Sequence, residues 1–61
     1  MYQELKLTGC TDSRQLYVEV TRVRGSVSVT DLGNSVWVYG EMTQEEFDRI
    51  IVICQKYGDI E

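Results

Sequence analysis

Apolar residues between positions 43 and 57 recur with the spacing of one face of an α-helix. They are Phe47, Ile50, Ile51, Cys54 and Tyr57. Thr43 and Glu46 have the T-x-x-E spacing of a capping box, in which each side chain bonds a backbone N–H of the first helical turn. We therefore predict a helix over residues 43–57, and we expect Gly58 to end it in the left-handed conformation.

Two stretches before this helix alternate between apolar and polar residues, as half-buried strands do. They cover residues 26–30 and 35–39, and each places two valines on one face. Gly33 and Asn34, in the segment between them, tolerate the positive φ that tight hairpin loops require. We predict a β-hairpin here. Residues 2–8 alternate in the same way and predict a short first strand.

Residues 13–24 are compatible with two structures. As a strand, the segment places Leu16, Val18 and Val20 on one face. As a helix, it brings four residues onto one stripe: Leu16, Tyr17, Val20 and Val23. Its density of β-branched residues favours the strand, because such side chains lose rotamer freedom in a helix and pack well on a pleated surface.

The predicted fold class is therefore α+β. We expect an antiparallel β-meander of three to four strands, with one C-terminal α-helix packed on one of its faces. If residues 13–24 are helical instead, the order of elements becomes βαββα. A chain of 61 residues can bury one hydrophobic core, so we expect residues 1–61 to form a single small domain.

The N-terminal residues and the cysteines indicate the compartment. Glu4 and Lys6 interrupt any apolar run, so neither a signal peptide nor a membrane span is expected, and the predicted location is the cytoplasm. Cys10 and Cys54 are the only cysteines, and without histidine they do not complete a zinc site. In a reducing compartment they are expected to be small buried hydrophobes, with a disulfide as the alternative.

Charge is distributed unevenly along the chain. The net charge is −4, made up of +1 over residues 1–30 and −5 over residues 31–61. Such a surface repels phosphate backbones and attracts basic partners. Three acidic residues of the predicted helix start are candidates for binding a protein partner, with a solvated helix face as the alternative. They are Glu45, Glu46 and Asp48.

Aromatic residues gather on one face of the predicted sheet. If residues 13–24 form a strand, four aromatic side chains point away from the helix: Tyr2, Tyr17, Trp37 and Tyr39. Tryptophan and tyrosine dominate the binding energy of many protein interfaces, so Tyr17, Trp37 and Tyr39 are candidate partner-binding residues, in a homodimer or with another protein. The alternative is that Trp37 and Tyr39 only cover each other.

An aromatic sheet face can also stack nucleobases, which gives an alternative function. The protein would then be a homodimeric nucleic-acid-binding module, with phosphate contacts from the basic residues of the N-terminal half. These are Lys6, Arg14, Arg22 and Arg24. The acidic net charge and the small number of cations make this alternative less favoured than a protein partner.

Residues 26–58 resemble the C-terminal half of the DinI-like damage-inducible proteins. The resemblance covers about half of the chain and lies in a V-x-V strand, a turn asparagine, a strand ending in glycine, and an acidic helix. The matching residues are Val27, Val29, Asn34, Gly40, Thr43, Arg49 and Ile50. In that family the acidic helix engages a recombinase filament, so the resemblance implies such a role for Glu45, Glu46 and Asp48.

Catalysis is not expected from this sequence. There is no histidine, and no serine or cysteine lies beside a plausible base. No catalytic residue, metal site or cofactor is predicted. We expect a small acidic binding protein that modulates or inhibits a macromolecular partner, such as a nucleic-acid-binding protein, of the kind found in phages and stress responses.

Overall fold

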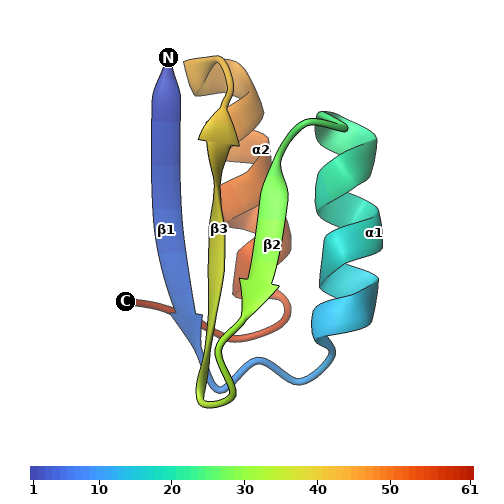
Figure 1. Ribbon diagram of the computed structural model, residues 1–61, viewed down its shortest axis with the longest axis vertical. Coiled ribbons are helices and arrows are strands. Elements are labelled where there is room, and N and C mark those ends of the chain that lie inside the picture. The colour runs from blue at the N-terminus through green and yellow to red at the C-terminus, as the bar shows by residue number, and fades with distance from the viewer.

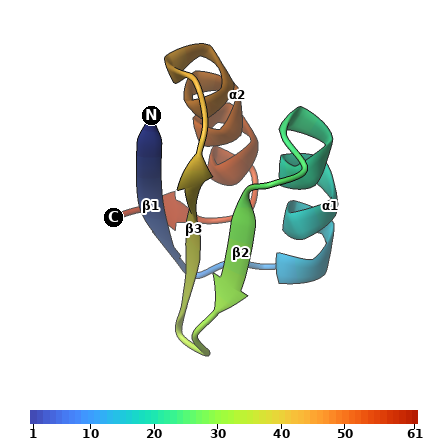
Figure 2. The same cartoon turned by 45° about the horizontal axis from the view of Figure 1, so that its top comes forward.

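The chain folds in the order strand, helix, strand, strand, helix, strand, and the computed structural model describes all of residues 1–61. The elements are β1 (Tyr2–Thr8), α1 (Ser13–Val23), β2 (Ser28–Asp31), β3 (Ser35–Glu41), α2 (Gln44–Gln55) and β4 (Asp59–Ile60). The strands form one antiparallel sheet in the order β2-β3-β1-β4. Both helices cover the same face of this sheet, as Figures 1 and 2 show.

This topology consists of two interlocked βαβ units. β1 and β2 run parallel on either side of β3, and β3 and β4 run parallel on either side of β1. The arrangement is the βαββαβ order of ferredoxin-like folds. It leaves one sheet face without a covering layer (Figure 2).

The predicted α+β class, the first strand, the hairpin and the C-terminal helix are confirmed. The predicted meander with a single helix is wrong in two respects. Residues 13–23 form a helix, and β1 is a central strand between β3 and β4. The alternative order βαββα is correct up to α2 but lacks β4.

Helix α1 forms because its start is capped and its apolar stripe is buried. The Asp12 side chain accepts a hydrogen bond from the backbone N–H of Gln15 at 3.1 Å. Leu16 and Val20, one helical turn apart, are fully buried. Burial of this stripe outweighs the strand preference of the β-branched residues, which is a weak and context-dependent effect.

Removing the Asp12 side chain tests whether it caps and stabilises α1. We expect Asp12→Ala to lower the free energy of unfolding by about 1 kcal/mol, the usual cost of removing an N-cap side chain. Asp12→Asn is the control, because asparagine caps as well as aspartate. Urea unfolding of the three proteins measures the difference. Equal stability of Asp12→Ala and the parent protein would contradict the proposed cap.

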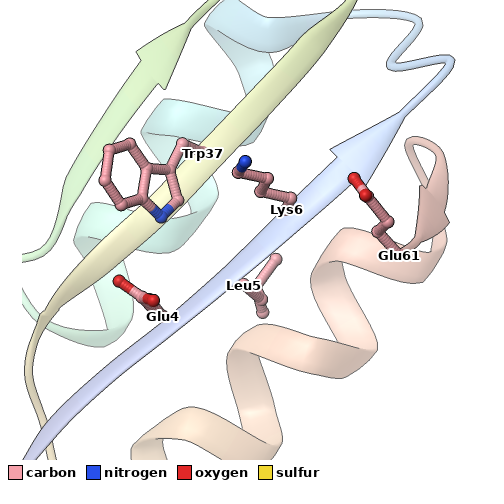
Figure 3. Close-up of a pocket in the computed structure, with 5 residues that line it drawn as sticks. All are labelled: Glu4, Leu5, Lys6, Trp37 and Glu61. Atoms are coloured by element: carbon pink, nitrogen blue, oxygen red, sulfur yellow. The ribbon is translucent and has the colours of Figure 1, made fainter.

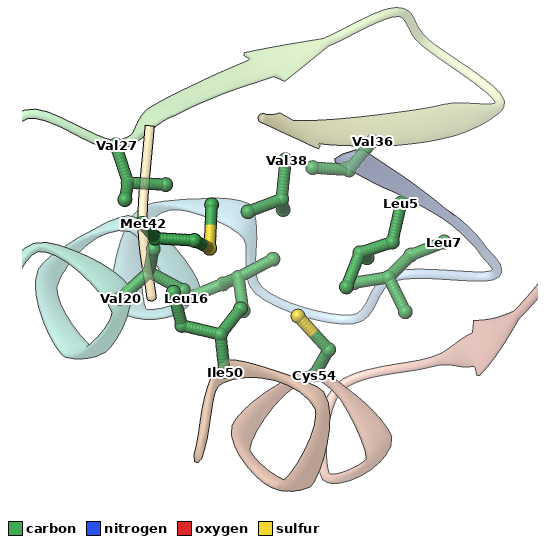
Figure 4. Packing of buried hydrophobic residues seen from close by; sticks show 10 residues of the cluster. All are labelled: Leu5, Leu7, Leu16, Val20, Val27, Val36, Val38, Met42, Ile50 and Cys54. Atoms are coloured by element: carbon green, nitrogen blue, oxygen red, sulfur yellow. The ribbon is translucent and has the colours of Figure 1, made fainter. Parts of the chain in front are cut away.

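The core lies between the sheet and the two helices (Figure 4). It contains ten buried residues: Leu5, Leu7, Leu16, Val20, Val27, Val36, Val38, Met42, Ile50 and Cys54. Both cysteines are free. Burial, with a smaller contribution from nearby Cys10, raises the pKa of the Cys54 thiol to about 12. Cys54 therefore acts as a small core hydrophobe, as the sequence predicted.

Helix α2 begins as predicted but ends differently. Thr43 and Glu46 form both hydrogen bonds of the capping box. The prediction for Gly58 is wrong, because Gly58 has no positive φ. A Cβ at this position would lie 2.7 Å from the Thr8 carbonyl oxygen, so glycine is needed for the close approach of two backbones. This approach brings the chain into β4, at the edge of β1.

Polar contacts join the two helices. Lys56 Nζ lies 2.9 Å from Glu19 Oε1, and the Tyr57 hydroxyl donates a hydrogen bond to the same carboxylate. These bonds lower the pKa of Glu19, with the Tyr57 bond as the largest cause. At the other end of the helix pair, Arg24 forms an ion pair with Glu46, with Arg24 Nη1 3.1 Å from Glu46 Oε1.

Candidate interaction surface

The uncovered face of the sheet carries two aromatic side chains on its central strand β3. Trp37 and Tyr39 are two residues apart, so they project from the same face. Their ring centroids lie 4.7 Å apart with a tilt of 41°. Lys6, opposite Trp37 on β1, places its Nζ 5.9 Å from the indole centroid. The Tyr39 hydroxyl lies 3.3 Å from Thr30 Oγ1 on β2, and this hydrogen bond holds the Tyr39 ring against β2.

A shallow hollow lies beside Trp37, near the point where the chain ends (Figure 3). It is lined by Glu4, Leu5, Lys6, Trp37 and Glu61. The backbone N–H of Glu61 donates to the Lys6 carbonyl at 2.9 Å, which holds Glu61 next to β1. None of the three charged residues in the hollow takes part in an ion pair. The hollow is therefore a place where unpaired carboxylates adjoin an aromatic ring.

The uncovered face is acidic. Alternation along β1, β3 and β4 places four carboxylates on it, and Lys6 is the only basic side chain among the outward positions of these strands. The carboxylates are those of Glu4, Glu41, Asp59 and Glu61. Glu41 pairs with the N-terminal ammonium group at 2.8 Å. The other three carboxylates have no cationic partner.

The structure brings together Trp37 and Tyr39 but not Tyr17. Tyr17 lies on α1, in the helical layer, where its side chain is 51% exposed. Its predicted place on the aromatic sheet face is wrong, because that place depended on a strand at residues 13–24. Tyr2, 49% exposed, lies on the uncovered face at the start of β1.

The acidic residues of α2 are engaged mainly within the protein. Glu46 closes the capping box and pairs with Arg24, and the hydrogen bond from the Thr43 backbone is the largest cause of its lowered pKa. Asp48 accepts a hydrogen bond from Gln44 at 2.9 Å. Glu45 is exposed. All three lie in the helical layer and do not join Trp37 and Tyr39 in one site.

The basic residues of the nucleic-acid alternative are also dispersed. Lys6 is on the uncovered face, whereas Arg14 and Arg22 lie on α1 and Arg24 follows its last turn. The sequence did not identify Glu61 as part of the site, because its position depends on a strand of only two residues. Glu4 was recognisable as an outward residue of the first strand, but nothing local marked it as a neighbour of Glu61.

No family model, curated protein or solved structure matches the chain. The DinI-like resemblance stays a prediction. Neither helix has the length and apolar character needed to cross a bilayer. No three His, Cys, Asp or Glu side chains are grouped in a way that would hold a metal ion.

Proposed function

We propose that the protein is a non-enzymatic binding module that docks a basic protein segment on its uncovered sheet face. The observation that carries the proposal is the contact pair of Trp37 and Tyr39. Beside it, in the hollow that Trp37 lines, lie the carboxylates of Glu4 and Glu61, which have no cationic partner. Aromatic anchors supply much of the affinity in protein interfaces, and complementary charge raises the rate and specificity of association.

Arginine is the residue that best fits the hollow beside Trp37. A planar guanidinium stacks on an indole ring and donates several hydrogen bonds to carboxylates. Glu4 and Glu61 line the same hollow as Trp37 and lack ion-pair partners. Charge-assisted hydrogen bonds of this kind are stronger than neutral ones. The binding energy would therefore centre on one arginine held between the ring and the two carboxylates.

Single-stranded nucleic acid is the second candidate. Aromatic residues on the central strands of a four-stranded sheet are the means by which RNA-recognition domains stack bases, and Trp37 and Tyr39 occupy such positions. The charges oppose this function, because each phosphate contact needs a cation and the face offers only Lys6 against four carboxylates. A basic protein segment is favoured for this reason.

Replacing Lys6 distinguishes the two candidates. We expect Lys6→Gln to strengthen binding of a labelled, end-blocked peptide of alternating arginine and valine by about two- to five-fold, because one exposed like-charge interaction is removed. Fluorescence anisotropy at low salt measures the affinity. A single-stranded DNA oligonucleotide is titrated in parallel.

Arg14→Gln is the matched control, because it makes the same change in net charge on the exposed surface of α1. It should leave affinity for the peptide within two-fold of the parent value. The proposal would be wrong if the parent protein bound the oligonucleotide but not the peptide, and if Lys6→Gln weakened oligonucleotide binding. Nucleic acid would then be the favoured partner.

A further inference from the structure

The edge of β1 is only partly occupied. β4 pairs with Leu7 and Thr8, and the bond from Glu61 to the Lys6 carbonyl extends this contact by one step. Main-chain groups of a strand point alternately to its two neighbours, so those of Tyr2 and Glu4 face the same edge as the Lys6 carbonyl. No backbone bond outside the helices and strands involves Tyr2 or Glu4. Their N–H and C=O groups are free to pair with another strand.

An apolar flank of α2 lies beneath this free edge. The side chain of Gln44 accepts a hydrogen bond from Gln3 on β1 at 3.2 Å, which shows which flank of α2 faces β1. Phe47 and Ile51 follow Gln44 on the same flank by helical spacing, and both are only partly buried against the core. Leu5 projects from β1 towards α2 (Figure 3). The free edge therefore borders a partly exposed apolar flank of α2.

We propose that the free edge of β1 and this flank of α2 accept one extended segment of the basic partner, which adds a strand in line with β4. This inference rests on the proposed function and specifies how the partner binds. Strand addition of this kind gains affinity from main-chain hydrogen bonds and specificity from alternate side chains. Here the available main-chain groups are those of Tyr2 and Glu4.

The register determines which side chains the segment carries. Because β4 is antiparallel to β1, the added strand continues from Glu61 towards Tyr2. Its residue opposite Glu4 points to the uncovered face, close to Glu61 and the hollow beside Trp37, and is basic. Its residues opposite Leu5 and Gln3 point to the α2 flank and are apolar. The partner segment therefore alternates apolar, basic, apolar.

A second copy of this chain fits the edge less well. Two copies joined through β1 would place two acidic faces side by side, each from a chain of net charge −4. Charged residues at a sheet edge disfavour such self-pairing. A basic strand neutralises the same carboxylates, so charge complementarity selects the partner over the second copy.

The substitution Glu4→Pro tests whether main-chain hydrogen bonds at the free edge bind the partner segment. It removes the Glu4 N–H that faces the free edge, while the β1–β3 hydrogen bonds are carried by the neighbouring residues. Glu4→Ala is the matched control, since it loses the carboxylate and keeps the N–H. With the alternating arginine and valine peptide, we expect Glu4→Ala to bind about two- to five-fold more weakly than the parent protein. We expect Glu4→Pro to bind at least about ten-fold more weakly than Glu4→Ala.

Three further measurements complete the test. Far-UV circular dichroism verifies that both variants are folded. Amide hydrogen exchange of the parent protein should show slower exchange at Tyr2 and Glu4 when the peptide is bound. An isomeric peptide with its arginines grouped together should bind about ten-fold more weakly than the alternating one.

The outcomes separate the inference from the proposed function. Equal binding by Glu4→Pro and Glu4→Ala, with no added protection at Tyr2 and Glu4, would overturn strand addition and leave docking on the sheet face intact. If Trp37→Ala left peptide affinity unchanged, the proposed function itself would be overturned. A dimer of the free protein that Glu4→Pro dissociates would assign the edge to a second copy instead.

Discussion

Leu16→Ala is expected to lower the free energy of unfolding by about 2–5 kcal/mol, the range for removing a buried leucine side chain. Leu16 is fully buried and projects from α1 into the core (Figure 4). The whole stability of a chain of this length is about 3–9 kcal/mol, at roughly 0.05–0.15 kcal/mol per residue. The substitution therefore removes much of the stability of the domain.

Tyr17→Ala is the control for this prediction, because Tyr17 is the next residue of α1 and its side chain is 51% exposed. It should change the free energy of unfolding by no more than about 0.5 kcal/mol. Urea unfolding, monitored by the fluorescence of the single tryptophan, gives both values. If the two variants were equally stable, the placement of α1 against the core would be wrong.

The elements that were predicted correctly depend on local signals. The capping box of α2 and its apolar stripe lie within one segment, and so does the alternation of the hairpin strands. Gly33 adopts the expected positive φ in the hairpin loop. Each of these features is decided by residues close in sequence, so the sequence alone was sufficient.

Helix α1 was missed because local preference and tertiary burial disagree there. The β-branched residues favour a strand, and a strand would place Leu16 and Val20 on one face just as the helix does. The helix buries these two residues fully and leaves Val18, which lies between them in sequence, only partly buried. A local helix signal was present in Asp12, which caps the helix through the N–H of Gln15. Once this segment is a helix, the strand order changes as well, because α1 connects β1 to a parallel strand across the sheet.

The candidate site was predictable where it depends on β3 alone. Alternation within β3 was enough to place Trp37 and Tyr39 together. The position of Tyr17 depended on the wrongly predicted strand, and that of Glu61 depends on β4. A two-residue strand carries no alternation pattern, so the position of Glu61 is set by backbone contacts that the sequence does not show. These are the close approach of Gly58 to Thr8 and the hydrogen bond from Glu61 to Lys6.

Trp37→Ala is expected to weaken binding of the alternating arginine and valine peptide by about 2 kcal/mol, or roughly 30-fold, the effect of truncating a central aromatic anchor. Trp37 both lines the hollow and contacts Tyr39, so its loss removes the surface on which the arginine stacks. Anisotropy of the labelled peptide, at low and high salt, measures the change in affinity without relying on tryptophan emission.

Two variants control for a general loss of aromatic surface or of folding. Tyr17→Ala removes an exposed aromatic ring from the helical layer and should leave peptide affinity unchanged. Trp37→Phe keeps a ring at the site and should retain an intermediate affinity, because phenylalanine is a weaker partner for a cation than tryptophan. Equal affinities for Trp37→Ala and Tyr17→Ala, with both variants folded, would show that the uncovered sheet face is structural. The acidic start of α2 would then become the remaining candidate surface.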